Sequence, residues 1–162
     1  MKTLLLLRHA KSSWANAQLA DHDRPLNGRG KGDAPKMGRL LDREELVPDL
    51  IISSSAERAL TTAELAALSA GYNAEIQVVR ALYLADPEDY IELLQQVSDN
   101  NERVMAVGHN PGIEELQEQL SGHYQRMSTA ALAQIELPIN HWGELDEEIN
   151  GHLINLWLPK EL

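Results

Sequence analysis

The stretch TLLLLRHA, residues 3–10, joins four consecutive leucines directly to Arg8 and His9. An uninterrupted apolar run of this kind is typical of a strand in the middle of a parallel sheet, where both faces are covered. Arg8 and His9 follow at the point where such a strand would leave the core. The stretch therefore predicts a central strand with two polar side chains at its carboxyl end.

Further strands are expected along the chain. Leu50–Ser54 and Arg103–His109 repeat the continuous apolar pattern, and Ala74–Val79 is a shorter candidate. The late stretches ALAQIEL (131–137) and HLINLWL (152–158) alternate apolar and polar residues, which favours strands that could be antiparallel.

Between these strands, apolar residues recur at the spacing typical of helices. The first helix is expected over about 31–46, and the second runs from an N-cap at Ser55 to a stop at Gly71. A third is expected over 86–97, and a fourth after the GHNPG segment at 108–112. In the second helix the apolar residues Leu60, Ala63, Ala67 and Leu68 recur at intervals of three or four residues. Strands that alternate with helices predict one α/β domain over residues 1–162, with a doubly wound, mostly parallel sheet flanked by helices.

Composition narrows the class of function. The chain of 162 residues has no cysteine, which excludes disulfides, thiolate nucleophiles and cysteine-based zinc sites. Its formal net charge is −11, which argues against nucleic acid or an anionic membrane as partner. No apolar run is long enough for a signal peptide or a membrane span, so the cytoplasm is the expected compartment.

Polar residues follow three of the expected parallel strands. Arg8 and His9 follow the first, Ser53–Ser55 and Arg58 the second, and Gly108–Asn110 the third. The carboxyl ends of parallel strands form the ligand-binding edge of such a sheet, so these side chains should meet. Two arginines can bind phosphate oxygens, and a neutral histidine among them can attack phosphorus, with His109 donating to a non-bridging oxygen. This chemistry requires neither a metal nor a cofactor.

Each of these residues also has a structural interpretation. A lone histidine at a strand end is usually hydrogen-bonded within the fold, and Arg58 could pair with Glu57 or Glu64. A metal-dependent hydrolase using His9, His109 and a carboxylate is disfavoured, because the spacing contains no compact ligand motif. The remaining histidines, expected to be solvated in loops or on surfaces, are His22, His123, His141 and His152.

Three segments together resemble the histidine phosphatase superfamily, which includes the phosphoglycerate mutases. They are RHA (8–10), with Ala10 at the usual glycine position, SSSAERALTTAE (53–64) and VGHNPGIEEL (107–116). DHDRPLNGRG (21–30) and RHAKSSW (8–14) are similar to the small SixA-type phosphohistidine phosphatases.

The resemblance implies a phosphoglycerate mutase-like fold and assigns roles to individual residues. His9 would be the phosphorylated nucleophile, Arg8 and Arg58 would bind the phosphoryl group, and His109 would be the second histidine of the pocket. Arg24 would either border the same site or anchor a loop, with Asp21 or Asp23 beside it. The residues after the nucleophile that could line the entrance are Ser12, Ser13 and Trp14.

One departure from the superfamily bears on the substrate. Mutases and phosphomonoesterases of this superfamily carry a glutamate general acid in a central insertion, whereas RALYLADPEDYIELL (80–94) has a leucine at the corresponding position and almost no insertion. Imidazole leaves from phosphorus more readily than an alkoxide does, which favours a phosphohistidine side chain on a protein as substrate. The candidate proton donors are Asp21, Asp23, Asp86 and Glu88.

Two other functions remain open at this point. A phosphatase for small phosphate esters would use the same fold and nucleophile. A phosphate-binding module without turnover would need only the arginines. The expected partner is therefore a phosphorylated protein or a small phosphate ester.

Overall fold

The leucine-rich strand β1 (Lys2–Arg8) lies inside a six-stranded sheet with the order β3-β2-β4-β1-β5-β6. In this computed structural model, which describes residues 1–162, β1 is parallel to β4 on one side and antiparallel to β5 on the other. The sheet is parallel from β3 to β1, and β6 is antiparallel to β5, so the predicted mostly parallel sheet with antiparallel late strands is confirmed. The other strands are β2 (Leu50–Ser54), β3 (Ile76–Val79), β4 (Arg103–Gly108), β5 (Leu132–Leu137) and β6 (His152–Trp157).

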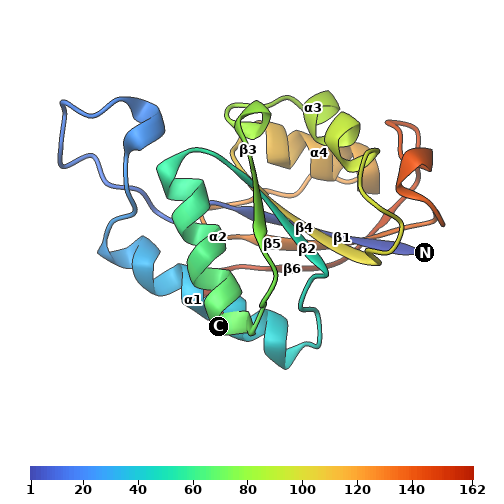
Figure 1. The fold of residues 1–162 in the computed structure, drawn as a ribbon, viewed down its shortest axis with the longest axis horizontal. Helices are drawn as coiled ribbons and strands as arrows, with labels where there is room; N and C mark the ends of the chain where they lie inside the picture. The colour runs from blue at the N-terminus through green and yellow to red at the C-terminus, as the bar shows by residue number, and fades with distance from the viewer.

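Four helices cover the two faces of this sheet. Figure 1 shows α1 (Gly28–Arg43) and α2 (Glu57–Ala70) side by side on one face, with α3 (Pro87–Leu94) and α4 (Gly112–Ser121) on the other. The result is the single α/β domain that the alternation of strands and helices predicts.

The four leucines of β1 divide between two hydrophobic cores. Leu4 and Leu6 belong to the core under α3 and α4, whereas Leu5 and Leu7 belong to the core under α1 and α2. All four side chains are fully buried, and burial of a leucine contributes about 1.5–3 kcal/mol. This double anchoring fixes the point at which the chain leaves the sheet.

The helix boundaries differ in places from the sequence-based expectation. Ser55 does not cap α2: the N-cap is Ala56, whose backbone N–H donates to Ser54 Oγ over 3.2 Å, and Ser55 faces the loop that contains His22. The predicted stop at Gly71 is confirmed by its left-handed φ of 77°. Leu68, one of the apolar residues at helical spacing, lies on the solvent side of α2 and is 80% exposed.

The first helix begins and ends earlier than expected. Asn27 caps α1 by accepting a hydrogen bond from Gly30 N over 2.9 Å. At the other end Glu45 takes a left-handed φ of 57°, which lets Leu46 N donate to Leu41 O over 2.8 Å. This reversal ends the helix before Leu46 while still burying that leucine.

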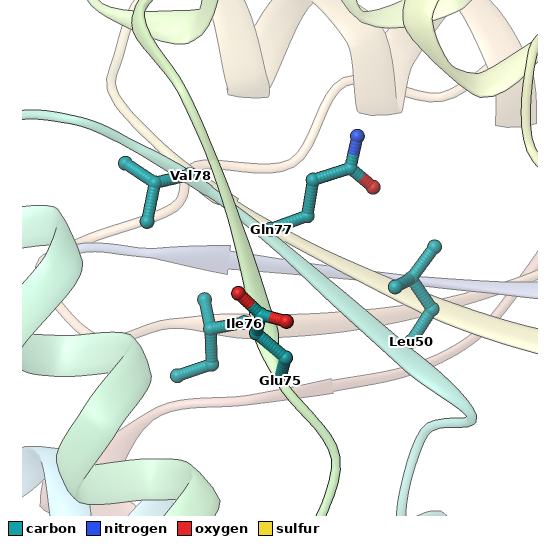
Figure 2. Close-up of a pocket in the computed structure, with 5 residues that line it drawn as sticks. All are labelled: Leu50, Glu75, Ile76, Gln77 and Val78. Carbon is teal, nitrogen blue, oxygen red and sulfur yellow. The ribbon is translucent and has the colours of Figure 1, made fainter.

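A surface cavity of about 540 Å³ lies along the edge strand β3. Figure 2 shows the side chains that line it, which come from Leu50, the first residue of β2, and from Glu75–Val78. It contains no cluster of histidine or arginine and begins at the amino ends of the strands, so it is not the site expected from the sequence. Separately, none of the helices combines the length and apolarity that a membrane crossing requires.

Candidate active site at the carboxyl ends of the strands

The polar residues predicted to meet at the sheet edge line one pocket. Arg8 ends β1 and is in register with Gly108, the last residue of β4, so the residues that follow the two strands are neighbours. In Figure 1 the segment between β1 and α1 extends beyond this same end of the sheet. The pocket measures about 190 Å³ and is lined by Arg8, His9, Lys11, Ser12, Trp14, Arg24, Arg58, Leu84, His109, Asn110 and Thr129.

The ring of His9 is oriented by a backbone carbonyl. Nδ1 lies 2.8 Å from the carbonyl oxygen of Ala10, and because that oxygen can only accept, Nδ1 carries the proton of the neutral ring. Nε2 therefore holds a lone pair and has no partner in the protein. Ala10, at the position where glycine is usual, is fully buried, and its N–H donates to Thr62 Oγ1 over 3.0 Å.

The His9 ring is also kept uncharged. Burial and the nearby guanidinium groups of Arg8, Arg58 and Arg24 outweigh the hydrogen bond to Ala10 and lower the pKa of His9 to about 4. At neutral pH the imidazole is consequently available as a nucleophile.

Arg8 and Arg58 face the same pocket with unused donors. Arg8 donates from Nη1 to the carbonyl of Met127 over 3.1 Å, and its Nε is buried without a partner. Arg58, in the first turn of α2, also has a buried Nε without a partner. Buried donors without partners are costly in a folded protein unless a ligand uses them. Both arginines are therefore suited to bind an anion beside His9.

Asp21 holds two of the pocket arginines in place. Its carboxylate accepts from Arg58 Nη2 over 2.9 Å and from Arg24 Nε over 3.2 Å, and its carbonyl accepts from Arg58 Nη1 over 2.7 Å. Arg58 thus pairs with Asp21 rather than with Glu57 or Glu64.

A tyrosine completes the environment of Asp21. Tyr83 donates its hydroxyl to Asp21 Oδ2 over 2.6 Å. This hydrogen bond, together with those from Arg58 and Arg24, lowers the pKa of Asp21 to about 2. A carboxylate that is ionised at all working pH values is a poor proton donor, so the geometry favours a positioning role for Asp21 instead.

Arg24 combines the two roles left open by the sequence. It lines the pocket, and it also anchors the loop after β1 by donating from Nη1 to Ser12 Oγ over 2.9 Å and to Ser13 O over 3.3 Å. Its guanidinium lies 3.5 Å from the ring centroid of Trp14. Trp14 is 73% exposed and so forms part of the pocket rim rather than of the core.

His109 lies directly beside His9. The two ring centroids are 5.1 Å apart, and His109 Nε2 is 2.8 Å from Ser54 Oγ at the end of β2. Burial, the neighbouring His9 and the guanidinium of Arg58 lower the pKa of His109 to about 3. His109 is therefore a neutral ring that can donate one hydrogen bond.

The other candidate proton donors do not line this pocket. Asp23 is exposed and lies 3.2 Å from His22 Nδ1, and Asp86 forms a capping box at the start of α3. Glu88 lines a different surface depression, together with residues such as Glu92 and Asp146. Asp86 and Glu88 are thus placed away from the pocket, and no aspartate or glutamate lines it.

Leu84 lines the pocket in the segment that corresponds to the general-acid glutamate of mutases and phosphomonoesterases in this superfamily. It is 62% exposed and takes a left-handed φ of 55°, an uncommon backbone conformation for leucine. Such outliers persist where the surrounding structure fixes them. The side of the pocket nearest this segment therefore presents an apolar side chain.

Some residues at the site were not expected from the sequence. His22, predicted to be solvated, is partly buried and its Nε2 lies 2.8 Å from Ser55 Oγ. Its ring packs edge-on against Tyr83, with 4.8 Å between centroids. Lys11 and Thr129 also line the pocket. No local sequence signal marks these residues, because they lie in the connections between the strands and α-helices, where apolar residues show no regular spacing.

Metal-binding capacity is a separate question. No group of three or more histidine, aspartate or glutamate side chains is arranged to hold a metal ion. His9 and His109 have no carboxylate beside them in the pocket lining, so the metal-dependent alternative lacks a ligand set.

Comparisons with known proteins agree with this arrangement. The sequence profile of the Histidine phosphatase superfamily (branch 1) matches residues 4–135. An uncharacterized chloroplastic protein of Arabidopsis thaliana is 34% identical over 152 residues, which cover 88% of this chain and 70% of the relative.

Solved structures extend the likeness to the whole chain. A crystal structure assigned to the phosphohistidine phosphatase SixA of Agrobacterium tumefaciens is 29% identical, with a TM-score of 0.83 and 98% of both chains covered. The protein histidine phosphatase SixA complexed with tungstate shares the fold at 22% identity, with a TM-score of 0.82 and 98% of both chains covered. On the sequence match and the shared fold, the chain belongs to the histidine phosphatase superfamily, branch 1.

Proposed function

We propose that the protein is a metal-independent phosphohydrolase that works through a phosphohistidine on His9 and acts on phosphohistidine side chains of a partner protein. The observation that carries the proposal is the unpartnered Nε2 of neutral His9 beside the unused buried donors of Arg8 and Arg58. A free nucleophile and paired phosphate-binding donors in one pocket are the requirements of phosphoryl transfer.

The reaction has two balanced steps. In the first, the lone pair of His9 Nε2 forms a bond to phosphorus while the bond from phosphorus to the leaving nitrogen breaks, and the substrate ring, protonated on its other nitrogen, leaves as a neutral imidazole. The positive charge that develops on the His9 ring strengthens the Nδ1–H hydrogen bond to Ala10 O, and Arg8 and Arg58 stabilise the charge on the phosphoryl oxygens. In the second step water attacks phosphorus and the bond from phosphorus to Nε2 breaks, so that the protons of the water stay on the released inorganic phosphate and His9 returns to its neutral Nδ1–H form.

The lining of the pocket supports the substrate class. An alkoxide leaving group needs a proton from a positioned acid, and general acid catalysis contributes about 10²–10⁴-fold to the rate. Leu84 lines the pocket and no carboxylate does, so the protein provides no obvious acid for such a group. The imidazole of phosphohistidine departs without an acid supplied by the protein when its other ring nitrogen is protonated, because the leaving group is then neutral imidazole, whose conjugate acid has a pKa near about 6.5.

The comparisons support the same substrate class. A structure with 29% identity and full-length overlap is assigned to a phosphohistidine phosphatase. The cytoplasm remains the predicted compartment, and a related protein of Arabidopsis thaliana is described as chloroplastic.

Trapping the intermediate tests the nucleophile. Brief exposure to a phosphohistidine protein labelled on phosphorus, followed by an alkaline denaturing quench, should leave label on His9, since P–N bonds survive alkali. His9→Ala should carry no label and show no turnover. His123→Ala, a change at an exposed loop residue, is the matched control and should be labelled normally. Label that persists in His9→Ala would contradict the assignment.

A substrate panel separates the remaining alternatives. We expect phosphohistidine protein to be turned over faster than sugar phosphates by at least about 10²-fold, the lower range of a missing general acid. Faster turnover of sugar phosphates would favour a small-molecule phosphomonoesterase. Tight binding of the phosphorylated protein without phosphate release would favour a phosphate-binding module.

A further inference from the structure

Ser54 is a buried hydroxyl in direct contact with a pocket histidine. It is the last residue of β2, it is fully buried, and its Oγ lies 2.8 Å from His109 Nε2. Its hydroxyl also accepts a hydrogen bond from the backbone N–H of Ala56 over 3.2 Å. These two contacts decide where the single hydroxyl proton goes.

The hydrogen-bond accounting favours one arrangement of protons. A hydroxyl has one proton to donate, and Ala56 N–H already occupies an acceptor position on Ser54 Oγ. If Ser54 donates to His109 Nε2, both of the hydroxyl contacts are satisfied. If Nε2–H donated instead, the hydroxyl proton of Ser54 would be buried with no acceptor, at a cost of about 1–3 kcal/mol.

The neutral state of His109 gives this choice a chemical consequence. Because His109 carries only one ring proton, an acceptor role for Nε2 places that proton on Nδ1. Nδ1 is buried and has no partner in the protein. The ring that carries it lies 5.1 Å, centroid to centroid, from the ring of His9.

We propose that Ser54 is a positioning residue that fixes His109 as the Nδ1–H tautomer, so that the unpartnered Nδ1–H serves as a donor to the phosphoryl group transferred to His9. The inference rests on the proposed function for its role in turnover, but the tautomer itself is a property of the free protein. The opposite tautomer would direct a lone pair toward an anionic group and would oppose its binding.

The free protein offers a direct test. Long-range ¹H–¹⁵N correlation spectra of the histidine rings distinguish a protonated from an unprotonated nitrogen, and the His109 signals are identified by their loss in His109→Gln. We expect Nδ1 protonated and Nε2 unprotonated in the wild-type protein. The reverse pattern would overturn the proposal, whether or not phosphatase activity is found.

Two substitutions test the cause of the tautomer. Ser54→Ala removes the donor to Nε2 and should convert His109 to a mixture of tautomers, with kcat for phosphohistidine protein lowered by about tenfold or more and KM less affected. Ser53→Ala is the matched control, since Ser53 is equally buried but its hydroxyl donates to the Ser54 carbonyl over 2.9 Å. It should leave the tautomer unchanged.

The outcomes separate this inference from the proposed function. An unchanged tautomer in a folded Ser54→Ala protein would overturn the role of Ser54, even if phospho-His9 is trapped as expected. Should no substrate be turned over, the nitrogen spectra still decide the tautomer while the proposed function fails on its own test.

Discussion

Asp21 shows how one side chain controls the geometry of several others. Its carboxylate binds Arg58, Arg24 and Tyr83, and it remains ionised because these donors hold its pKa at about 2. A carboxylate that binds two arginines of the pocket limits the rotamers they can adopt before a ligand arrives. This preorganisation is a means by which enzymes gain transition-state stabilisation.

Replacing Asp21 tests this positioning role. We expect Asp21→Asn to lower kcat/KM for phosphohistidine protein by at least about tenfold, because a charge-assisted hydrogen bond contributes about 1.5–3 kcal/mol. Asp23→Asn is the matched control, since Asp23 is exposed and contacts only His22, and it should change kcat/KM little. Steady-state kinetics measure both. Equal effects of the two substitutions would contradict the positioning role.

The residues at the strand ends could be predicted from the sequence, whereas their supporting contacts could not. Arg8, His9 and His109 lie at or directly after apolar strands, so a local pattern is enough to place them. The contacts from Arg58 to Asp21 and from Tyr83 to Asp21 join residues 37 and 62 positions apart. Such pairs depend on the path of a loop, which carries no hydrophobic period. The same reason explains why the place of His22 was missed.

The connection between β3 and α3 forms the side of the pocket that would face the leaving group in the proposed reaction. The turn Arg80–Leu82 leads to Tyr83, whose ring lies 5.6 Å from that of His109, and then to Leu84 at the pocket rim. The capping box of Asp86 fixes the start of α3 immediately afterwards. Leu84 is therefore held between two ordered turns, at a position where a longer polar side chain would reach the pocket.

Introducing an acid at this position should broaden the substrate range. We expect Leu84→Glu to raise kcat for alkyl phosphates by about 10²-fold, the lower end of what general acid catalysis contributes. Leu84→Gln has the same shape without a proton to donate, and it should give no such increase. Turnover of an alkyl phosphate and of phosphohistidine protein by both variants is the measurement. A similar gain in Leu84→Gln would contradict an acid effect.

At the level of elements the sequence was most informative where periodicity is strong. The β2 boundaries at Leu50 and Ser54 match the predicted apolar run. The helix α2 stops at Gly71 because the residue that ends it takes a left-handed φ, which glycine adopts readily. Ser55 is not the cap because α2 begins one residue later than expected, with Ala56 at the N-cap, and the Ser55 hydroxyl lies against His22 instead. A contact between residues 33 positions apart cannot be predicted from the local sequence.

The whole molecule should respond to pH through its buried histidines. An unfolded chain binds protons on His9 and His109 near pH 6.5, whereas the folded protein does so only near about 4 and 3. The unfolded state therefore binds more protons between these values, and stability falls as the pH decreases from about 6.5. Each histidine contributes up to about 1.4 kcal/mol per pH unit within its window.

Chemical denaturation at a series of pH values checks this dependence. The free energy of unfolding should decrease steadily between pH 7 and pH 4 in the wild-type protein, and the decrease should be smaller in His109→Gln. His123→Gln, at an exposed position, serves as the control and should follow the wild type. A pH-independent free energy of unfolding in the wild type would contradict the buried neutral state of both rings.

The division of the β1 leucines between two cores has a further consequence for how the molecule opens. A strand whose side chains alternate between two separate cores cannot detach from one without disturbing the other. The amide protons of Leu4 to Leu7 should therefore exchange with solvent deuterium only when the entire domain unfolds, more slowly than those of the edge strands. Since His9 is attached directly to this strand, heating should abolish activity in the same transition that melts the fold, with no earlier loss from local fraying.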